Sequence, residues 1–271
     1  MNLLPEDLNY IVNRLPTDVR KLMKKGNIYL AGGFIRSCIA NEQVNDIDLW
    51  GADAEQLKVT AQLFAGERKV RCMMTDNACT ILTNGRTPVQ FITRWTYDDP
   101  VRLAESFDYS IASAVIWYEW FDAQPADGSR VYGQWKSHCH DTFYADLASK
   151  RLRYLFPVRN EDAGGSMLRM TKFLARGYRI APESLAGLIA RMNAGIKYEN
   201  FLTTDEGHQA RVYAGLLREV DPLTIVDGCE VLGTEEKRSN LMDHNPLMAH
   251  IAHCSDQACP ICQPVTGEDV L

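Results

Sequence analysis

Residues 30–50, LAGGFIRSCIANEQVNDIDLW, constrain the fold more than any other part of the chain. The segment starts at the end of an apolar strand and passes through Gly32-Gly33 into a stretch with helical spacing of apolar residues. It ends in an alternating stretch that indicates a second strand. A glycine pair lets backbone N–H groups approach an anion because no Cβ intervenes, and the following helix points its positive end to the same place. The segment therefore predicts an anion-binding turn between two strands.

Two carboxylates lie on the second of these strands. Asp46 and Asp48 are two residues apart, so both side chains share one face, while Ile47 points into the core. Carboxylate oxygens are hard ligands that suit Mg²⁺, and Arg36 in the first helical turn adds a fixed cation. Two Mg²⁺ ions held in this way can activate an attacking hydroxyl and neutralise a leaving pyrophosphate. We expect nucleotidyl transfer from such a site.

The arrangement resembles the polymerase β-like nucleotidyltransferases, and most closely the head domain of bacterial CCA-adding enzymes and poly(A) polymerases. Their pattern is Gly-Gly-x-x-Arg-Asp followed by Asp-x-Asp. Positions in that pattern are filled here by Gly32, Gly33, Arg36, Asp46 and Asp48. Ser37 stands where the family has the aspartate after the arginine. The resemblance implies an NTP substrate, an RNA 3′ end as the first choice of acceptor, and an EC 2.7.7-type reaction.

Two further stretches resemble the family with substitutions. Residues 89–95, VQFITRW, are similar to the strand that supplies a third acidic residue, and Gln90 stands at that position. Residues 107–114, FDYSIASA, are similar to a family motif that retains Asp108 but lacks its basic lead-in. The resemblance makes Asp108 a candidate third carboxylate or nucleotide contact. An N-cap or strand-end aspartate is the alternative.

The second half of the resemblance is helical. Residues 145–154 are similar to the segment that enters the family's neck, and residues 161–184 to its Glu-Asp-x-x-Arg-x-x-Arg-x-x-Arg-Phe motif. Asp162 is present, the first arginine is absent, and Arg169 and Lys172 keep the later basic positions. The resemblance implies that these three residues contact the nucleotide. Between residues 146 and 179 there are eight basic and three acidic residues, which can either steer a polyanion or form a solvated helix face.

The pattern along the chain predicts an α/β (α+β) head with a mixed sheet, followed by a helical neck and body. We expect a head at residues 1–145, a neck and body at 146–245, and a Cys/His-rich tail at 246–271. Helices are expected at 4–13, 17–25, 53–65, 100–106, 145–155, 166–176, 181–193 and 206–219. Strands are expected at 27–31, 46–50, 70–74, 78–83 and 88–95, with Asn84-Gly85 as a hairpin turn. Residues 109–117 fit either a strand or a helix, and His138-Cys139-His140 is expected in a loop.

The tail has the spacing of a zinc knuckle. Cys259-x-x-Cys262 supplies two ligands, and Cys254 with His253 completes a tetrahedral set, with His250 as an alternative ligand. We expect a structural Zn²⁺ there. A redox pair or free thiols are the alternatives.

Composition limits the functions that fit. The 271 residues carry a net charge of −6, which argues against a long nucleic-acid footprint. No apolar run spans a membrane and no signal segment precedes residue 25, so a cytoplasmic protein is expected. Besides RNA, a protein or small-molecule acceptor remains open, as in regulatory or toxin-like members of the family. A non-catalytic nucleotide- or RNA-binding relative is the third alternative.

Overall fold

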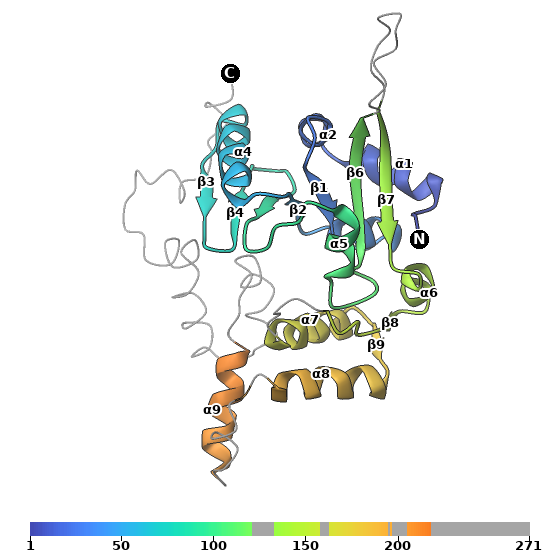
Figure 1. Cartoon of the computed structure of the whole chain (residues 1–271), viewed down its shortest axis with the longest axis vertical. Coiled ribbons are helices and arrows are strands. Elements are labelled where there is room, and N and C mark those ends of the chain that lie inside the picture. The colour runs from blue at the N-terminus through green and yellow to red at the C-terminus, as the bar shows by residue number, and fades with distance from the viewer. Residues whose placement is uncertain (121–132, 158–162, 195, 197–204, 218–271) are drawn as a thin grey trace, which may run out of the picture. The chain divides into compact units, whose positions relative to one another are not determined.

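The computed structural model describes residues 1–120, 133–157, 163–194, 196 and 205–217 (Figure 1). A seven-stranded mixed sheet in the order β3-β4-β5-β2-β1-β6-β7 dominates it, which confirms the mixed-sheet prediction. Its strands are β1 (Tyr29–Ala31), β2 (Ile47–Trp50), β3 (Cys72–Met74), β4 (Ala78–Ile81), β5 (Val89–Ile92), β6 (Ala114–Trp120) and β7 (Gly133–Cys139). Within this sheet β2 and β5 run parallel, and the other pairs are antiparallel.

Apart from α6, the helices begin and end close to where the apolar spacing predicts. They are α1 (Pro5–Arg14), α2 (Thr17–Lys24), α3 (Gly33–Ile39), α4 (Ala54–Glu67), α5 (Pro100–Glu105), α6 (Phe143–Ala148), α7 (Ala163–Ala175), α8 (Pro182–Ala194) and α9 (Glu206–Leu216). Side-chain caps explain two of the starts. Asp53 accepts a hydrogen bond from Gln56 N (2.7 Å) at α4, and Asp99 accepts one from Val101 N (2.8 Å) at α5.

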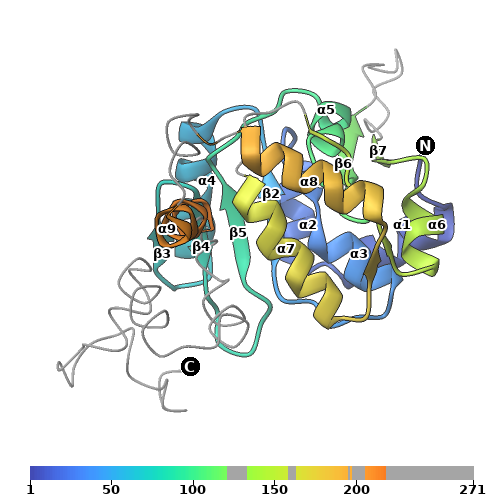
Figure 2. The ribbon, with the colours of Figure 1, turned by 90° about the horizontal axis from the view of Figure 1, so that it is seen from below.

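The two faces of the sheet differ in chemistry. Leu30, Leu49 and Phe91 are in register across β1, β2 and β5, so they share one face, and all three are fully buried. Helix α4 covers that face, where Phe64 contacts the ring of Phe91 edge-on at 6.0 Å between centroids. Because side chains alternate along a strand, Asp48 points to the opposite face. The sheet thus buries Leu30, Leu49 and Phe91 on one face and places Asp48 on the other. Figure 2 shows the sheet and its helices from a second direction.

Part of the acidic face is closed by a second apolar cluster. Helix α5 contributes Leu103 and Ala104, which pack with Tyr29, Ala31, Trp50 and Val115. Phe107 lies against the cluster and meets the Trp50 ring edge-on at 5.9 Å between centroids. Residues 109–117, which fitted either element, divide between a turn and the start of β6.

The hairpin turn predicted at Asn84-Gly85 joins β4 and β5 as expected. These strands pair antiparallel, and Arg86 N donates to Thr83 O (3.0 Å) across the turn. Gly85 has φ +68°, in the left-handed region that glycine adopts without strain.

The prediction of one long helix at residues 145–155 is wrong. Helix α6 ends at Ala148, and Lys150 has φ +49°, which a continuing right-handed helix does not allow. The chain then forms β8 (Arg151–Leu152), which pairs in parallel with β9 (Arg179–Ile180). The loop expected at His138-Cys139-His140 is also wrong for its first two residues, which end β7 and pair with β6.

Contacts divide the chain into two units. The first comprises residues 1–161 and 177–189, and contains the sheet, β8 and β9. The second comprises residues 162–176 and 190–271, and its described part contains α7 and α9. Asp162 and the whole Cys/His-rich tail, including His250, His253, Cys254, Cys259 and Cys262, lie outside the described residues. None of the helices in the described residues is long and apolar enough to span a membrane.

Candidate active site

The carboxylates of Asp46 and Asp48 both reach the glycine pair at the start of α3. A Cβ placed on Gly32 would lie 3.9 Å from Asp48 Oδ2, and one placed on Gly33 would lie 3.9 Å from Asp46 Oδ1. Both aspartates are partly exposed, while Ile47 between them is fully buried. Two acidic groups therefore face the positive end of α3 across a surface that carries no side chain.

Backbone geometry requires glycine at position 32. Gly32 has φ +81° and ψ −132°, a conformation that is essentially restricted to glycine. Its N–H donates to Ala114 O (3.2 Å), which anchors the turn to β6. A Cβ there would also lie 3.3 Å from the Phe107 ring. The turn is thus held by a hydrogen bond to β6 on one side and by the Phe107 ring on the other.

Gly32→Ala is expected to lower the free energy of unfolding by about 1–3 kcal/mol, because alanine pays the strain of this backbone conformation. Gly66→Ala is the matched control: Gly66 lies in α4 with nothing within 4 Å of a Cβ, so alanine should stabilise by roughly 0.5–1 kcal/mol. Urea denaturation of both variants measures the difference. A Gly32→Ala variant that is as stable as wild type, or is stabilised as Gly66→Ala is, would show that the Gly32 turn carries no strain.

Arg36 is positioned by an acidic partner that the sequence did not reveal. Its side chain is buried, with Nε 3.6 Å from Glu42 Oε2 and Nη2 donating to Ser37 Oγ (3.1 Å). Glu42 also accepts a hydrogen bond from Tyr178 OH (2.9 Å). The Arg36 Nη2 atom would lie 3.8 Å from a Cβ on Gly33, beside Asp46 Oδ1. A carboxylate from Glu42, rather than from residue 37, therefore holds the guanidinium beside the glycine pair.

Gln90 lies next to Asp48 on the neighbouring strand. These two residues are in register in the parallel pair β2–β5, and Gln90 is in register with Thr80 on β4. The three side chains form a row across one face of the sheet, and Gln90 Nε2 donates to Thr80 Oγ1 (3.5 Å). Gln90 is 3% exposed. The position for which the resemblance implies a third carboxylate is thus occupied by a buried neutral amide.

Asp108 is buried, and its role as a third carboxylate or nucleotide contact stays a prediction. Among residues 1–120, 133–157 and the other described ranges, no three His, Cys, Asp or Glu side chains cluster so as to hold a metal ion. Asp108 is 1% exposed, and its carbonyl accepts a hydrogen bond from Leu155 N (2.8 Å). Its turn is held by the segment after α6, where Ser110 N donates to Arg153 O (3.1 Å).

Asp146 forms a buried hub beneath that turn. Its carboxylate accepts hydrogen bonds from Ser110 Oγ (2.7 Å), Thr142 Oγ1 (2.6 Å) and Arg153 Nε (2.9 Å). Burial opposes ionisation of Asp146, but the hydrogen bonds from Arg153, Thr142 and Ser110 outweigh it and lower the pKa of the carboxyl. The resemblance implies that this segment enters the neck. In the structure, its Asp146 and Arg153 hold the turn at Ser110 in place.

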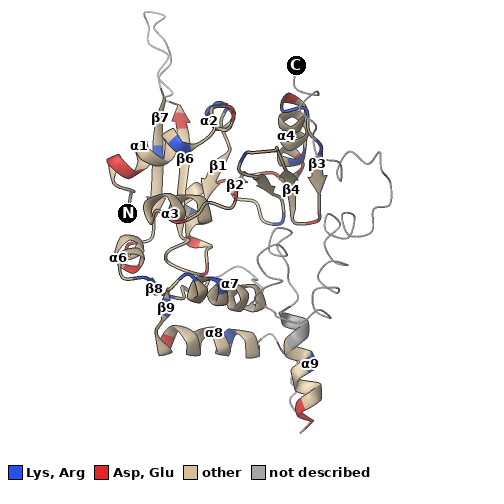
Figure 3. Cartoon of the chain, turned by 180° about the vertical axis from the view of Figure 1, so that it is seen from behind, with Lys and Arg blue, Asp and Glu red and all other residues tan. Residues whose placement is uncertain are grey.

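The two basic residues predicted to contact the nucleotide, Arg169 and Lys172, both lie on α7. Figure 3 shows Lys and Arg along β8, β9 and α7. In α7, Arg169 Nη2 donates to Ser166 Oγ (3.3 Å), and Lys172 lies one turn further along, partly exposed. Their contact with a nucleotide stays a prediction.

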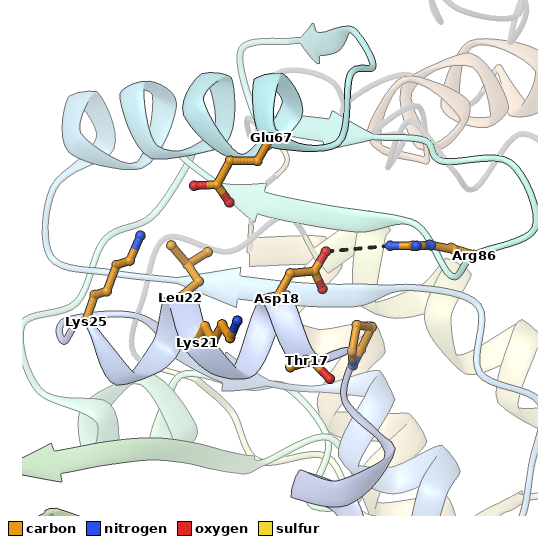
Figure 4. Close-up of a pocket in the computed structure, with 8 residues that line it drawn as sticks. Thr17, Asp18, Lys21, Leu22, Lys25, Glu67 and Arg86 are labelled. Atoms are coloured by element: carbon orange, nitrogen blue, oxygen red, sulfur yellow. Dashed lines mark ion pairs between the residues drawn. The ribbon is translucent and has the colours of Figure 1, made fainter. Parts of the chain in front are cut away.

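A cavity of about 780 Å³ lies apart from these carboxylates, between α2, the end of α4 and the β4–β5 turn. Figure 4 shows Lys21, Lys25 and Arg86 around it with Asp18 and Glu67, and Arg86 lies 3.7 Å from Asp18. Because α4 covers the Phe91 face of the sheet, this cavity is on the side opposite Asp48 and Gln90. None of the residues predicted for the active site lines it.

A glycine turn at the start of α3 that faces a carboxylate pair beside a mixed sheet is the arrangement that the resemblance to polymerase β-like nucleotidyltransferases predicts. Residues 4–150 match the sequence model described as "Gad2: Gabija anti-defense 2 family protein". Since this match covers more than half of the 271 residues, the chain belongs to the Gabija anti-defense 2 family.

Solved structures of tRNA-processing enzymes are similar to the chain in fold. The Thermotoga maritima CCA-adding enzyme complexed with tRNA is 18% identical, with a TM-score of 0.45, over 90% of this chain and 54% of that one. A CCA-adding enzyme with ATP is 17% identical, with a TM-score of 0.47, over 90% of this chain and 54% of that one. A tRNA-processing enzyme with CTP is 17% identical, with a TM-score of 0.45, over 87% of this chain and 69% of that one. The chain thus spans about half the length of the first two enzymes. No curated protein matches it.

Proposed function

We propose that this chain transfers a nucleoside monophosphate from an NTP to an acceptor hydroxyl, with Asp46 and Asp48 as the cation-binding carboxylates. The observation that supports the proposal most is the approach of both carboxylates to the glycine pair, each 3.9 Å from a Cβ position. In the reaction the acceptor oxygen bonds to the α-phosphorus and the bond to pyrophosphate breaks. Pyrophosphate leaves, and the acceptor's proton passes to solvent.

The residues present fit a divalent cation. Mg²⁺ is commonly held by one or two carboxylates together with substrate phosphates, and Asp46 and Asp48 supply two carboxylates beside a glycine pair whose backbone N–H groups a phosphate can approach. When bound, the cation neutralises charge that develops on the phosphates. The N–H groups at the start of α3 and the Arg36 guanidinium supply fixed positive charge for the same oxygens.

An RNA 3′ end is the first acceptor to test. The resemblance to CCA-adding enzymes and poly(A) polymerases implies it, and the excess of basic residues between 146 and 179 suits a polyanion. Asp162, Arg169 and Lys172 are the proposed nucleotide contacts in this part of the chain.

A protein or small-molecule acceptor is the second candidate. Two observations favour it: the net charge of −6, and membership of a family whose name describes an action against the Gabija defence. Under this alternative, the modified acceptor is a component of that defence, and the transferred nucleotide is what blocks it.

Incubation of the purified chain with each of the four α-³²P-labelled NTPs and Mg²⁺ tests the proposal and separates the acceptors. One reaction contains total RNA, and another contains protein from cells that carry the Gabija defence. We expect label on one of the two pools, and its loss when EDTA removes the cation. If none of the NTPs gives EDTA-sensitive label on either pool, the proposed transfer is wrong.

A further inference from the structure

Gln90 is the residue of β5 in register with Asp48. Its side chain therefore determines whether Asp48 has a neighbouring ligand with which to bind a cation. Partners on adjacent strands lie about 4.8 Å apart and point to the same face. A charged side chain here would extend the acidic pair into a group of three. The neutral amide of Gln90 instead contacts Thr80 Oγ1 on the far side, at 3.5 Å.

Charge and burial explain why this difference matters. A carboxylate at a position that is 3% exposed is costly unless a cation compensates for it. The Gln90–Thr80 pair carries no charge, so this part of the site is stable with no ion beside it. An amide oxygen is also a much weaker ligand for a hard cation than a carboxylate is. Two carboxylates remain, which suffices for one Mg²⁺ that shares the phosphates of a nucleotide.

We infer that Gln90 restricts the site to a single divalent cation, the one that enters with the triphosphate. This inference rests on the proposed function and replaces the two ions that the sequence led us to expect. Gln90 therefore sets the number of divalent cations that the site binds, and Gln90→Glu supplies the ligand for a second ion.

Mn²⁺ titration followed by electron paramagnetic resonance counts the ions directly, with a non-hydrolysable α,β-methylene NTP at saturation. The wild-type complex should bind one Mn²⁺ and the Gln90→Glu complex two. Gln90→Leu, which keeps the volume and adds no charge, should bind one. Gln62→Glu adds the same carboxylate at an exposed position on α4 and should also bind one.

Thermal denaturation gives a second readout. Gln90→Glu should melt below wild type in EDTA because its new carboxylate is buried without compensation, and Mn²⁺ with nucleotide should raise its Tm more than that of wild type. Gln90→Asp serves as a second variant if the glutamate prevents folding.

The possible failures are distinguishable. Two Mn²⁺ ions in the wild-type complex, or one ion in a folded Gln90→Glu complex, would overturn the inference and leave the proposed function standing. A wild-type chain that binds neither Mn²⁺ nor nucleotide would contradict both.

Discussion

Asp48→Asn is expected to lower the rate of nucleotidyl transfer by on the order of 10³-fold without loss of folded structure. Several kcal/mol of charge stabilisation depend on a bound cation, and about 1.4 kcal/mol corresponds to a tenfold change in rate. Asp48 is partly exposed and lies beside the like charge of Asp46 over the glycine pair. Removing one of two neighbouring negative charges does not destabilise the fold, so the effect should fall on activity.

The measurement is the initial rate of label transfer at saturating NTP, alongside a urea unfolding curve for each variant. Glu183→Gln removes an exposed acidic charge on α8 and should keep the wild-type rate. Asp46→Asn should behave as Asp48→Asn does. Wild-type rates in both aspartate variants would place the chemistry elsewhere in the chain.

Asp146→Ala should lower the free energy of unfolding by about 2–4 kcal/mol, the largest loss of stability that we expect from a single change. Breaking a buried ion pair leaves its partner uncompensated and costs about 3–5 kcal/mol, and the 38% exposure of Arg153 reduces that figure. The hydroxyls of Ser110 and Thr142 lose their acceptor as well. Chemical denaturation measures the loss.

The same carboxylate gives this contribution a pH dependence. Because folding lowers the pKa of Asp146, its stabilisation is fully present above the pKa of an unfolded aspartate, about 3.9, and is lost as the pH falls through the lower folded value. The stability difference between wild type and Asp146→Ala should therefore shrink below about pH 4. Asp141→Ala removes an exposed ion pair with the N-terminus, which water screens, so it should cost much less stability than Asp146→Ala. An equal loss in both variants would show that the hub adds nothing beyond a surface pair.

The central pair could be predicted from sequence because its geometry is local. Asp46 directly precedes β2 and Asp48 lies in it, two positions apart, and a glycine turn at a helix start needs no distant partner. The alternation at residues 46–50 and the helical spacing after Gly33 therefore led directly to β2 and α3. The mixed sheet followed from the order of these elements.

Contacts between distant residues were not predictable in the same way. Nothing in the spacing indicated that Glu42 lies beside Arg36, or that Tyr178 donates to Glu42 from 136 positions away. Periodicity also missed the end of α6, because the residues after it keep apolar spacing while Lys150 adopts a left-handed conformation.

Gln90 illustrates the boundary between the two cases. The resemblance identified its position and the missing charge from sequence. Its consequence depends on the register of three strands, which places Asp48, Gln90 and Thr80 in one row and buries the amide.

A crystal structure of the chain with Mn²⁺ and an α,β-methylene NTP tests the central claim most directly, through the anomalous signal of the metal. We predict an anomalous peak within coordination distance of both the Asp46 and Asp48 carboxylates, with the triphosphate on the Gly32-Gly33 turn. A nucleotide bound away from that turn, or a metal peak that touches neither aspartate, would contradict the account.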